Sequence, residues 1–114
     1  MTTGRRALGS HGENLVARWY ENRGLSVVDR NWRCREGEID LVVSGSRLVI
    51  FCEVKTRSSD AYGSPASAVT AAKQSRLRRL AILWMREHRT GPVSIRFDVA
   101  CVLRGEVSVI ESAF

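Results

Sequence analysis

Apolar residues recur with two different spacings along the chain, one typical of helices and one typical of strands. Over residues 6–23 the spacing is helical, with Leu15 four residues before Trp19 and Val16 four residues before Tyr20. Later segments instead alternate between apolar and polar residues or form short apolar runs, which is typical of strands. These segments predict strands over residues 25–30, 38–43, 47–55, 93–103 and 106–110.

Turn and loop residues separate these segments. The polar, basic stretch 31–37 predicts a loop, the stretch 44–46 a hairpin turn, and Arg104 with Gly105 the turn between the last two strands. A short helical piece is expected from Ser64 and Pro65 to residue 69. Thr70 then caps a long helix over about residues 71–89.

The predicted order is therefore α-β-β-β-α-β-β, without an internal repeat or a low-complexity segment. This order predicts an α/β fold in which a mixed central sheet is flanked by the two helices. A chain of 114 residues is long enough for one domain of ordinary size, which we expect to span residues 1–114.

Composition narrows the class of protein. Hydrophobic residues make up 44% and charged residues 26% of the chain, as in an ordinary globular domain. The longest apolar run covers residues 48–52, which is too short to cross a membrane, and no apolar signal segment follows Met1. We therefore expect a soluble, cytoplasmic protein that is not associated with a membrane.

Three cysteines, Cys34, Cys52 and Cys101, are too few and too widely spaced for a disulfide framework. The two histidines lie far from them in the sequence, so a zinc site is not expected either. Cys52 and Cys101 lie within apolar runs and are expected to be buried free thiols.

The chain is basic, with 18 Lys and Arg against 12 Asp and Glu and a net charge of +6. Such a domain binds polyanions, most commonly nucleic acid. All but two of the 18 are arginines, a bias that a coding preference explains equally well, and the exceptions are Lys55 and Lys73.

A charged constellation falls on the central strands. Glu53 and Lys55 project from one face of a strand, and Asp40 lies in the neighbouring strand between two apolar residues. If Gly45 and Ser46 form a two-residue turn, Asp40 lies diagonal to Glu53 on the same face, within reach of one metal ion. A three-residue turn without a bulge would place the two carboxylates on opposite faces.

The helices add two more charged side chains on their apolar faces. Glu13 falls within the apolar face of the first helix, where a carboxylate needs a cation, a hydrogen-bond network or an open site. Lys73 lines up with the apolar residues Leu77, Leu80 and Trp84 of the second helix. Carboxylates that converge with a lysine predict phosphodiester hydrolysis that depends on Mg²⁺ or Mn²⁺.

These motifs resemble a known superfamily. The segments GEIDL at residues 37–41 and FCEVKTR at residues 51–57 are similar to the PD-(D/E)xK, or restriction-endonuclease-like, nucleases. The whole chain resembles the YraN family of small bacterial proteins, which are themselves similar to Holliday-junction resolvases. That likeness includes GSHGE at 9–13, RNWR at 30–33, YG at 62–63, KQ at 73–74 and RFDV at 96–99.

The resemblance implies a role for each matching residue. Asp40 and Glu53 would be the ligands of Mg²⁺ or Mn²⁺, together with the backbone carbonyl of Val54, and Lys55 would be the catalytic lysine. The remaining matches are an acid of the first helix, Glu13, and two polar residues that line the site, Lys73 and Gln74. Resolvase-like relatives act as dimers, which implies a homodimer. Ile39 replaces the proline of the superfamily motif, a minor departure.

Several of these residues also have a purely structural interpretation. Trp32 is as well explained by packing as by stacking on a base, and Glu13 by an ion pair with an arginine. Glu38 is either a solvated residue at the start of its strand or an additional acid of the site. Asp98 is expected to satisfy local hydrogen bonds, and the arginines of the second helix to be a solvated surface.

Three functions therefore remain in view. The first is an endonuclease that hydrolyses DNA, with branched DNA as a candidate substrate. Its phosphate contacts would be loop arginines beside the site, namely Arg33, Arg35 and Arg57. The second is a nucleic-acid-binding protein that retains the metal pocket with little or no turnover. The third is a small interaction domain whose acids are paired with arginines.

Overall fold

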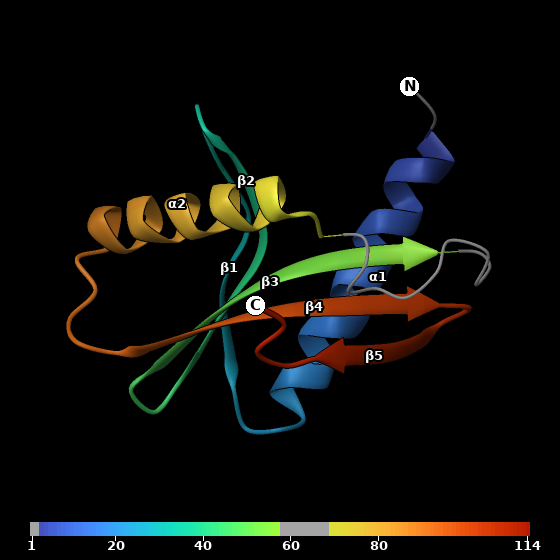
Figure 1. Cartoon of the computed structure of the whole chain (residues 1–114). Coiled ribbons are helices and arrows are strands. Elements are labelled where there is room, and N and C mark those ends of the chain that lie inside the picture. Colours follow the sequence, from blue (N-terminus) through green and yellow to red (C-terminus); the bar gives the residue numbers. More distant parts are fainter. Residues whose placement is uncertain (1–2, 58–68) are drawn as a thin grey trace.

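Five strands form one mixed sheet with a helix on each face (Figure 1). The computed structural model describes residues 3–57 and 69–114, and of residues 3–9 only the backbone. The elements are α1 (Thr3–Glu21), β1 (Ser26–Cys34), β2 (Gly37–Gly45), β3 (Leu48–Arg57), α2 (Ala71–Glu87), β4 (Ser94–Leu103) and β5 (Glu106–Ile110). The predicted order of elements is confirmed, whereas the helical piece expected from Ser64 lies outside the described residues.

The sheet has the strand order β1-β2-β3-β4-β5. Neighbouring strands are antiparallel except β3 and β4, which are parallel. Two consecutive parallel strands require a long crossover connection, and α2 lies within it. No helix in the described part of the chain is long and apolar enough to span a membrane.

Each helix buries one apolar face against the sheet. The α1 residues Val16 and Tyr20 pack on one side, against apolar residues of β2, β3 and β4. On the other side α2 packs through the residues predicted to face inward, namely Leu77, Leu80 and Trp84. The sheet is therefore covered on both sides, and charged side chains reach its surface where these layers end.

The start of α2 is fixed as the sequence predicts. Thr70 has extended backbone angles and its hydroxyl accepts a hydrogen bond from the backbone N–H of Lys73 at 3.2 Å. This satisfies one of the N–H groups that have no partner within the helix. The cap thus places Lys73 in the first turn of α2, above the sheet.

The loop expected over residues 31–37 is wrong. β1 continues to Cys34 and pairs with β2, and the two strands are joined by the turn residues Arg35 and Glu36. Pairing with β2 and packing of the half-buried Trp32 outweigh the polar character of this stretch. Trp32 packs against the core, and its indole N–H donates a hydrogen bond to Glu87 at 2.8 Å, as the packing interpretation predicts. Stacking on a base stays a prediction.

The hairpin between β2 and β3 also differs from the prediction. Gly45 pairs with Leu48, so the turn consists of Ser46 and Arg47 rather than Gly45 and Ser46. Glycine suits this strand position because a Cβ there would lie 2.6 Å from the side chain of Leu25. The register moves by two residues, which leaves every side chain on its predicted face.

Gly12 marks a close approach between α1 and β3. An added Cβ would clash with the Thr56 hydroxyl oxygen. Alanine usually stabilises a helix interior by about 1 kcal/mol relative to glycine. Here we expect Gly12→Ala to lower the free energy of unfolding by about 1–3 kcal/mol, because the helix must move away from the sheet.

Urea denaturation followed by circular dichroism measures this effect. The control introduces Gly12→Ala in a Thr56→Ala background, where the clashing hydroxyl is absent and the loss should be smaller. An equal loss in both backgrounds would show that the contact with Thr56 is not its cause.

Candidate functional site

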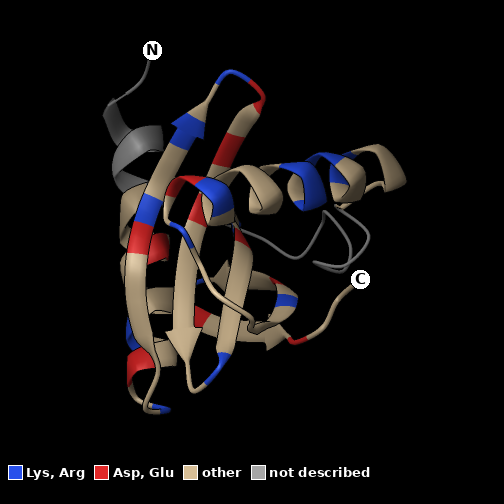
Figure 2. Ribbon diagram, turned by 90° about the vertical axis from the view of Figure 1, so that its left-hand side faces the viewer, with Lys and Arg blue, Asp and Glu red and all other residues tan. Residues whose placement is uncertain are grey.

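A cleft of about 230 Å³ lies between α2 and the strands β2 and β3. One wall is acidic and consists of Glu38, Asp40 and Glu53, from β2 and β3. The opposite wall belongs to α2 and carries two cations above apolar residues: Lys73, Arg76, Leu77 and Leu80. In Figure 2 acidic positions lie on the central strands and basic positions lie along α2 and at the tip of the β1–β2 hairpin.

Register and one hydrogen bond position Asp40. The β2–β3 pairing ends at Leu41 and Cys52, and its continuation places Asp40 across from Glu53 rather than diagonal to it. The backbone N–H of Val54 donates a hydrogen bond to the Asp40 carboxyl group at 2.8 Å. This bond to the Asp40 side chain takes the place of the next backbone hydrogen bond between β2 and β3, and it holds the carboxyl group against β3.

Asp40 and Glu53 interact directly. Burial and a hydrogen bond to Glu53 raise the pKa of Asp40 to about 9. Burial alone would raise the pKa of Glu53, but hydrogen bonds from Asp40 and Lys73 outweigh it and lower that pKa. The pair therefore holds one proton, with Asp40 as the donor and the Glu53 carboxylate, whose residue is 8% exposed, as the acceptor.

Both lysines of the chain meet at this pair. The Lys73 ammonium group lies 2.6 Å from the Glu53 carboxylate, whereas that of Lys55 lies 3.9 Å away. Burial and the neighbouring Lys73 lower the pKa of Lys55. Burial opposes protonation of Lys73 as well, but its hydrogen bond to Glu53 raises its pKa. The closer partner of Glu53 is thus Lys73 of α2 and not the lysine of the strand motif.

Glu13 adds a carboxyl group from α1. It is half-buried and accepts a hydrogen bond from the Asn31 side chain at 3.0 Å. Burial is the main cause that raises its pKa, and the nearby Glu38 adds to the shift. Its hydrogen-bond partner is therefore an amide, and not the arginine expected if Glu13 had a purely structural role. Glu13 also acts electrostatically on Asp40, so the helix acid lies beside the predicted site.

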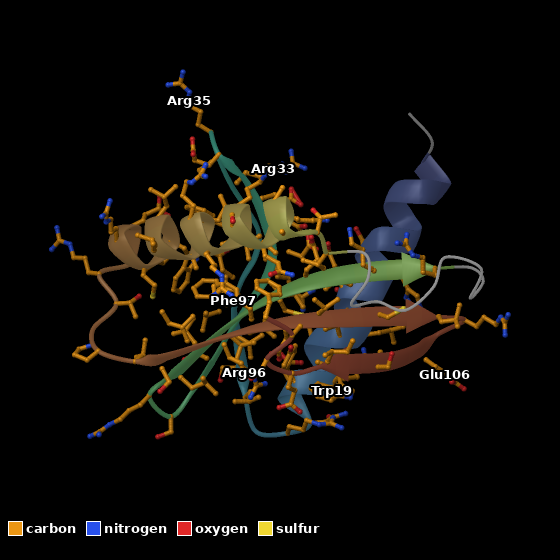
Figure 3. The ribbon with its side chains drawn as sticks, viewed as in Figure 1. Trp19, Arg33, Arg35, Arg96, Phe97 and Glu106 are labelled. Carbon is orange, nitrogen blue, oxygen red and sulfur yellow. The ribbon has the colours of Figure 1, made fainter. Side chains whose placement is uncertain are left out.

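The predicted nucleic-acid contacts differ in their surroundings. Arg33 lies on β1 rather than in a loop, pairs with Glu38, and has a side chain 78% exposed. Arg35 is exposed in the hairpin turn, and both arginines point away from the body of the protein (Figure 3). Arg57 is half-buried at the end of β3. The Gln74 amide donates to the Val69 carbonyl at 3.2 Å and so supports the start of α2.

The acid Glu38 and the cation Arg76 both line the cleft. The observed register, continued along β2, places Glu38 diagonal to Glu53. The predicted register would instead have placed it directly opposite Glu53. Arg76 was expected on a solvated surface, although its position three residues after the inward-facing Lys73 is a sequence signal for the same helix face.

The donor atoms of the cleft suit a hard divalent cation. The carboxyl oxygens of Asp40 and Glu53 are the kind of donor that Mg²⁺ and Mn²⁺ prefer, although Asp40 must give up its proton to bind either ion. Across residues 3–57 and 69–114, however, no group of three or more Asp, Glu, His or Cys side chains is arranged to hold a metal ion. An ion would therefore bind to the Asp40–Glu53 pair and require Lys73 to move from Glu53.

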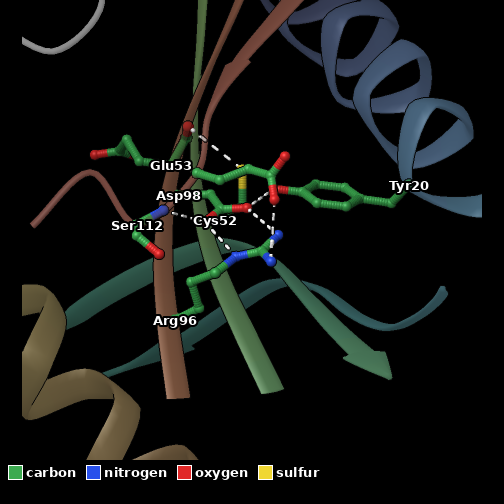
Figure 4. Close-up of polar contacts among 7 residues, drawn as sticks. Tyr20, Cys52, Glu53, Arg96, Asp98 and Ser112 are labelled. Carbon is green, nitrogen blue, oxygen red and sulfur yellow. Dashed lines mark hydrogen bonds and ion pairs between the residues drawn. The ribbon is translucent and has the colours of Figure 1, made fainter. Parts of the chain in front are cut away.

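A second polar cluster surrounds Asp98, which is 1% exposed (Figure 4). Its carboxylate accepts hydrogen bonds from the Tyr20 hydroxyl at 2.6 Å and from two Arg96 nitrogens, each at 2.9 Å. The Ser112 N–H donates a further bond at 3.0 Å. The expected role in hydrogen bonding is correct, but the partners extend to α1 and to the segment after β5. The cysteine beside this cluster, Cys52, is buried as predicted, whereas Cys101 is only half-buried.

The fold and this cleft define a small mixed α/β protein in which paired carboxylates face two cations of a helix. The chain belongs to the family described as Uncharacterised protein family UPF0102, whose model matches residues 12–102. The resemblance to the YraN family of small bacterial proteins is thereby confirmed, whereas the likeness to PD-(D/E)xK nucleases stays a prediction.

Its relatives are similar over most of their length. A UPF0102 protein of Beutenbergia cavernae is 52% identical over 98 residues, which are 86% of this chain and 83% of the relative. One from Frankia alni is 49% identical over 104 residues, covering 91% and 87% of the two chains. One from Nocardia farcinica is 50% identical over 99 residues, covering 87% and 78%.

Proposed function

We propose that this protein is a metal-dependent endonuclease that hydrolyses phosphodiester bonds of DNA and has the restriction-endonuclease-like organisation. The observation that carries the proposal is that Asp40 and Glu53 line one cleft and that the Lys55 ammonium group lies 3.9 Å from the Glu53 carboxylate. Two acidic side chains buried side by side are costly, since Asp40 retains its proton and Glu53 is held by Lys73, and a purely structural role does not require them. Carboxylates that hold a metal ion and a lysine that stabilises developing negative charge together can support hydrolysis of a phosphodiester.

Each residue has a proposed role. Asp40, Glu53 and the Val54 carbonyl would hold Mg²⁺ or Mn²⁺. When bound, the ion polarises the phosphate and lowers the pKa of a coordinated water. Lys55 orients the attacking water and stabilises the charge that develops on the phosphate oxygens. Glu13 supplies a further acceptor beside Asp40 for the water network.

The substrate is proposed from charge and exposure. The positive charge of the chain and the exposed arginines of the β1–β2 hairpin favour a polyanion, and Arg33, Arg35 and Arg57 are the proposed phosphate contacts. Contacts of this kind position a nucleic acid without reading its sequence, so we propose that the protein selects DNA structure, with branched DNA as the candidate. A homodimer in the cytoplasm would present two clefts to such a junction.

A second candidate is a nucleic-acid-binding protein that retains the cleft without appreciable turnover. Two observations favour it: Lys73 lies 2.6 Å from Glu53, and the described side chains include no ready-made group of three metal ligands. A lysine held in this way would neutralise the carboxylate permanently and leave the arginines to bind the nucleic acid.

A cleavage assay separates these functions. The substrates are labelled duplex, single-stranded, flap and four-way-junction DNA and an RNA duplex, each with Mg²⁺, Mn²⁺ or EDTA. We expect cutting that requires metal and is fastest on one branched DNA. Binding that weakens with salt but no cutting would support the second candidate. If the protein neither cuts these substrates nor binds them in a salt-dependent way, both candidates are contradicted and an interaction domain is favoured.

A further inference from the structure

Arg76 occupies a distinctive place in the cleft. It projects from α2 one turn beyond Lys73 and lines the same cavity as the three carboxylates. Its side-chain stem passes close to the hairpin, since a Cβ added to Gly37 would lie 3.4 Å from the Arg76 Cδ atom. Gly37 has a φ of 147°, which strongly favours glycine, so the hairpin backbone is fixed where it lies against the arginine stem.

The cations around Arg76 already have partners. Lys73 is paired with Glu53, Arg79 with Glu36, and Arg33 with Glu38. Arg78 lies over the ring of Phe97, 5.2 Å from its centroid.

Within the described residues, by contrast, Arg76 has neither an ion pair nor a side-chain hydrogen bond, although it shares a cavity with carboxylates. The residue is exposed, so its guanidinium group can be reached from solvent.

We propose that Arg76 binds a backbone phosphate of the nucleic acid next to the acidic wall of the cleft. A guanidinium group presents a planar pair of donors that matches two phosphate oxygens, which an ammonium group cannot do. Arg76 lies between the hairpin arginines and the carboxylates, so it would join the outer phosphate contacts to the site of reaction. The inference rests on the proposed function, because it assigns one phosphate contact within that site.

Fluorescence anisotropy of a labelled four-way-junction DNA in EDTA tests this assignment without metal-dependent turnover. We expect Arg76→Gln to weaken binding about tenfold and to reduce the slope of log affinity against log salt by about 0.9, the value for one phosphate. Arg76→Lys should keep the wild-type slope but bind more weakly, because it retains the charge and loses the paired donors. Mn²⁺ affinity should not fall in either variant.

Arg86→Gln is the matched control, since Arg86 is an exposed arginine of the same helix about 15 Å further along its axis. It should bind as the wild type does. If Arg76→Gln and Arg86→Gln have equal affinities and slopes while the wild type binds, the phosphate assignment is wrong and the proposed function survives. If the wild type neither binds nor cuts any nucleic acid, the proposed function itself fails and the assignment fails with it.

Discussion

Lys55→Ala is expected to lower the rate of metal-dependent cleavage at least about 100-fold, the effect of removing one charge-stabilising donor from a hydrolytic site. The Lys55 ammonium group lies 3.9 Å from Glu53 and is partly buried, and a water that took its place would not carry its positive charge. Single-turnover cleavage of the preferred DNA measures the loss. Mn²⁺ affinity, measured by calorimetry, should not fall, because the variant keeps Asp40 and Glu53 and removes a positive charge.

Lys73→Ala is the matched control, because Lys73 is the other lysine beside Glu53 and the closer of the two. Its removal should relieve competition for Glu53 and strengthen Mn²⁺ binding, with a smaller loss of rate than Lys55→Ala. The reverse order of the two rate losses would transfer the catalytic role from Lys55 to Lys73. Unchanged cleavage in both variants would contradict a lysine-assisted mechanism.

Much of the fold follows from local sequence signals. The order of elements, the Thr70 cap and the inward face of α2 depend on spacing and capping, which act over a few residues. The extension of β1 to Cys34 does not, because it depends on pairing with β2 and on packing of Trp32 against α2. Contacts between distant segments outweighed local preference there.

The carboxylate pair shows which errors matter at the site. The predicted turn was displaced, yet Asp40 and Glu53 still share a face, because a shift of two residues preserves the alternation of side chains. The alternation along β3 likewise placed Lys55 beside Glu53. The hydrogen bond from Val54 to Asp40 and the contact of Lys73 with Glu53 required the three-dimensional arrangement of β2, β3 and α2. The unpaired state of Arg76 could not be inferred either, because it depends on which acids its neighbours contact.

Asp98→Ala is expected to lower the free energy of unfolding by about 3–5 kcal/mol, the cost of breaking a buried ion pair by removing one partner. Arg96, whose side chain is 21% exposed, would keep only its ion pair with Glu111. The Tyr20 hydroxyl, on a residue that is 0% exposed, would lose its Asp98 acceptor. Urea denaturation followed by circular dichroism measures the change. A loss below about 1 kcal/mol would mean that water reaches the cluster and replaces the carboxylate.

Two further variants separate the charge from the hydrogen bonds. Tyr20→Phe removes one donor and leaves Asp98 paired with Arg96, so it should cost only about 1 kcal/mol. The double variant Arg96→Met with Asp98→Leu removes both charges and fills their space, and it should be more stable than Asp98→Ala because no buried charge is left unpaired. A double variant that is less stable than Asp98→Ala would show that neutralising a buried charge is not the main contribution of the cluster. The cluster would then stabilise the fold through its specific hydrogen-bond geometry, which joins α1, β4 and the segment at Ser112.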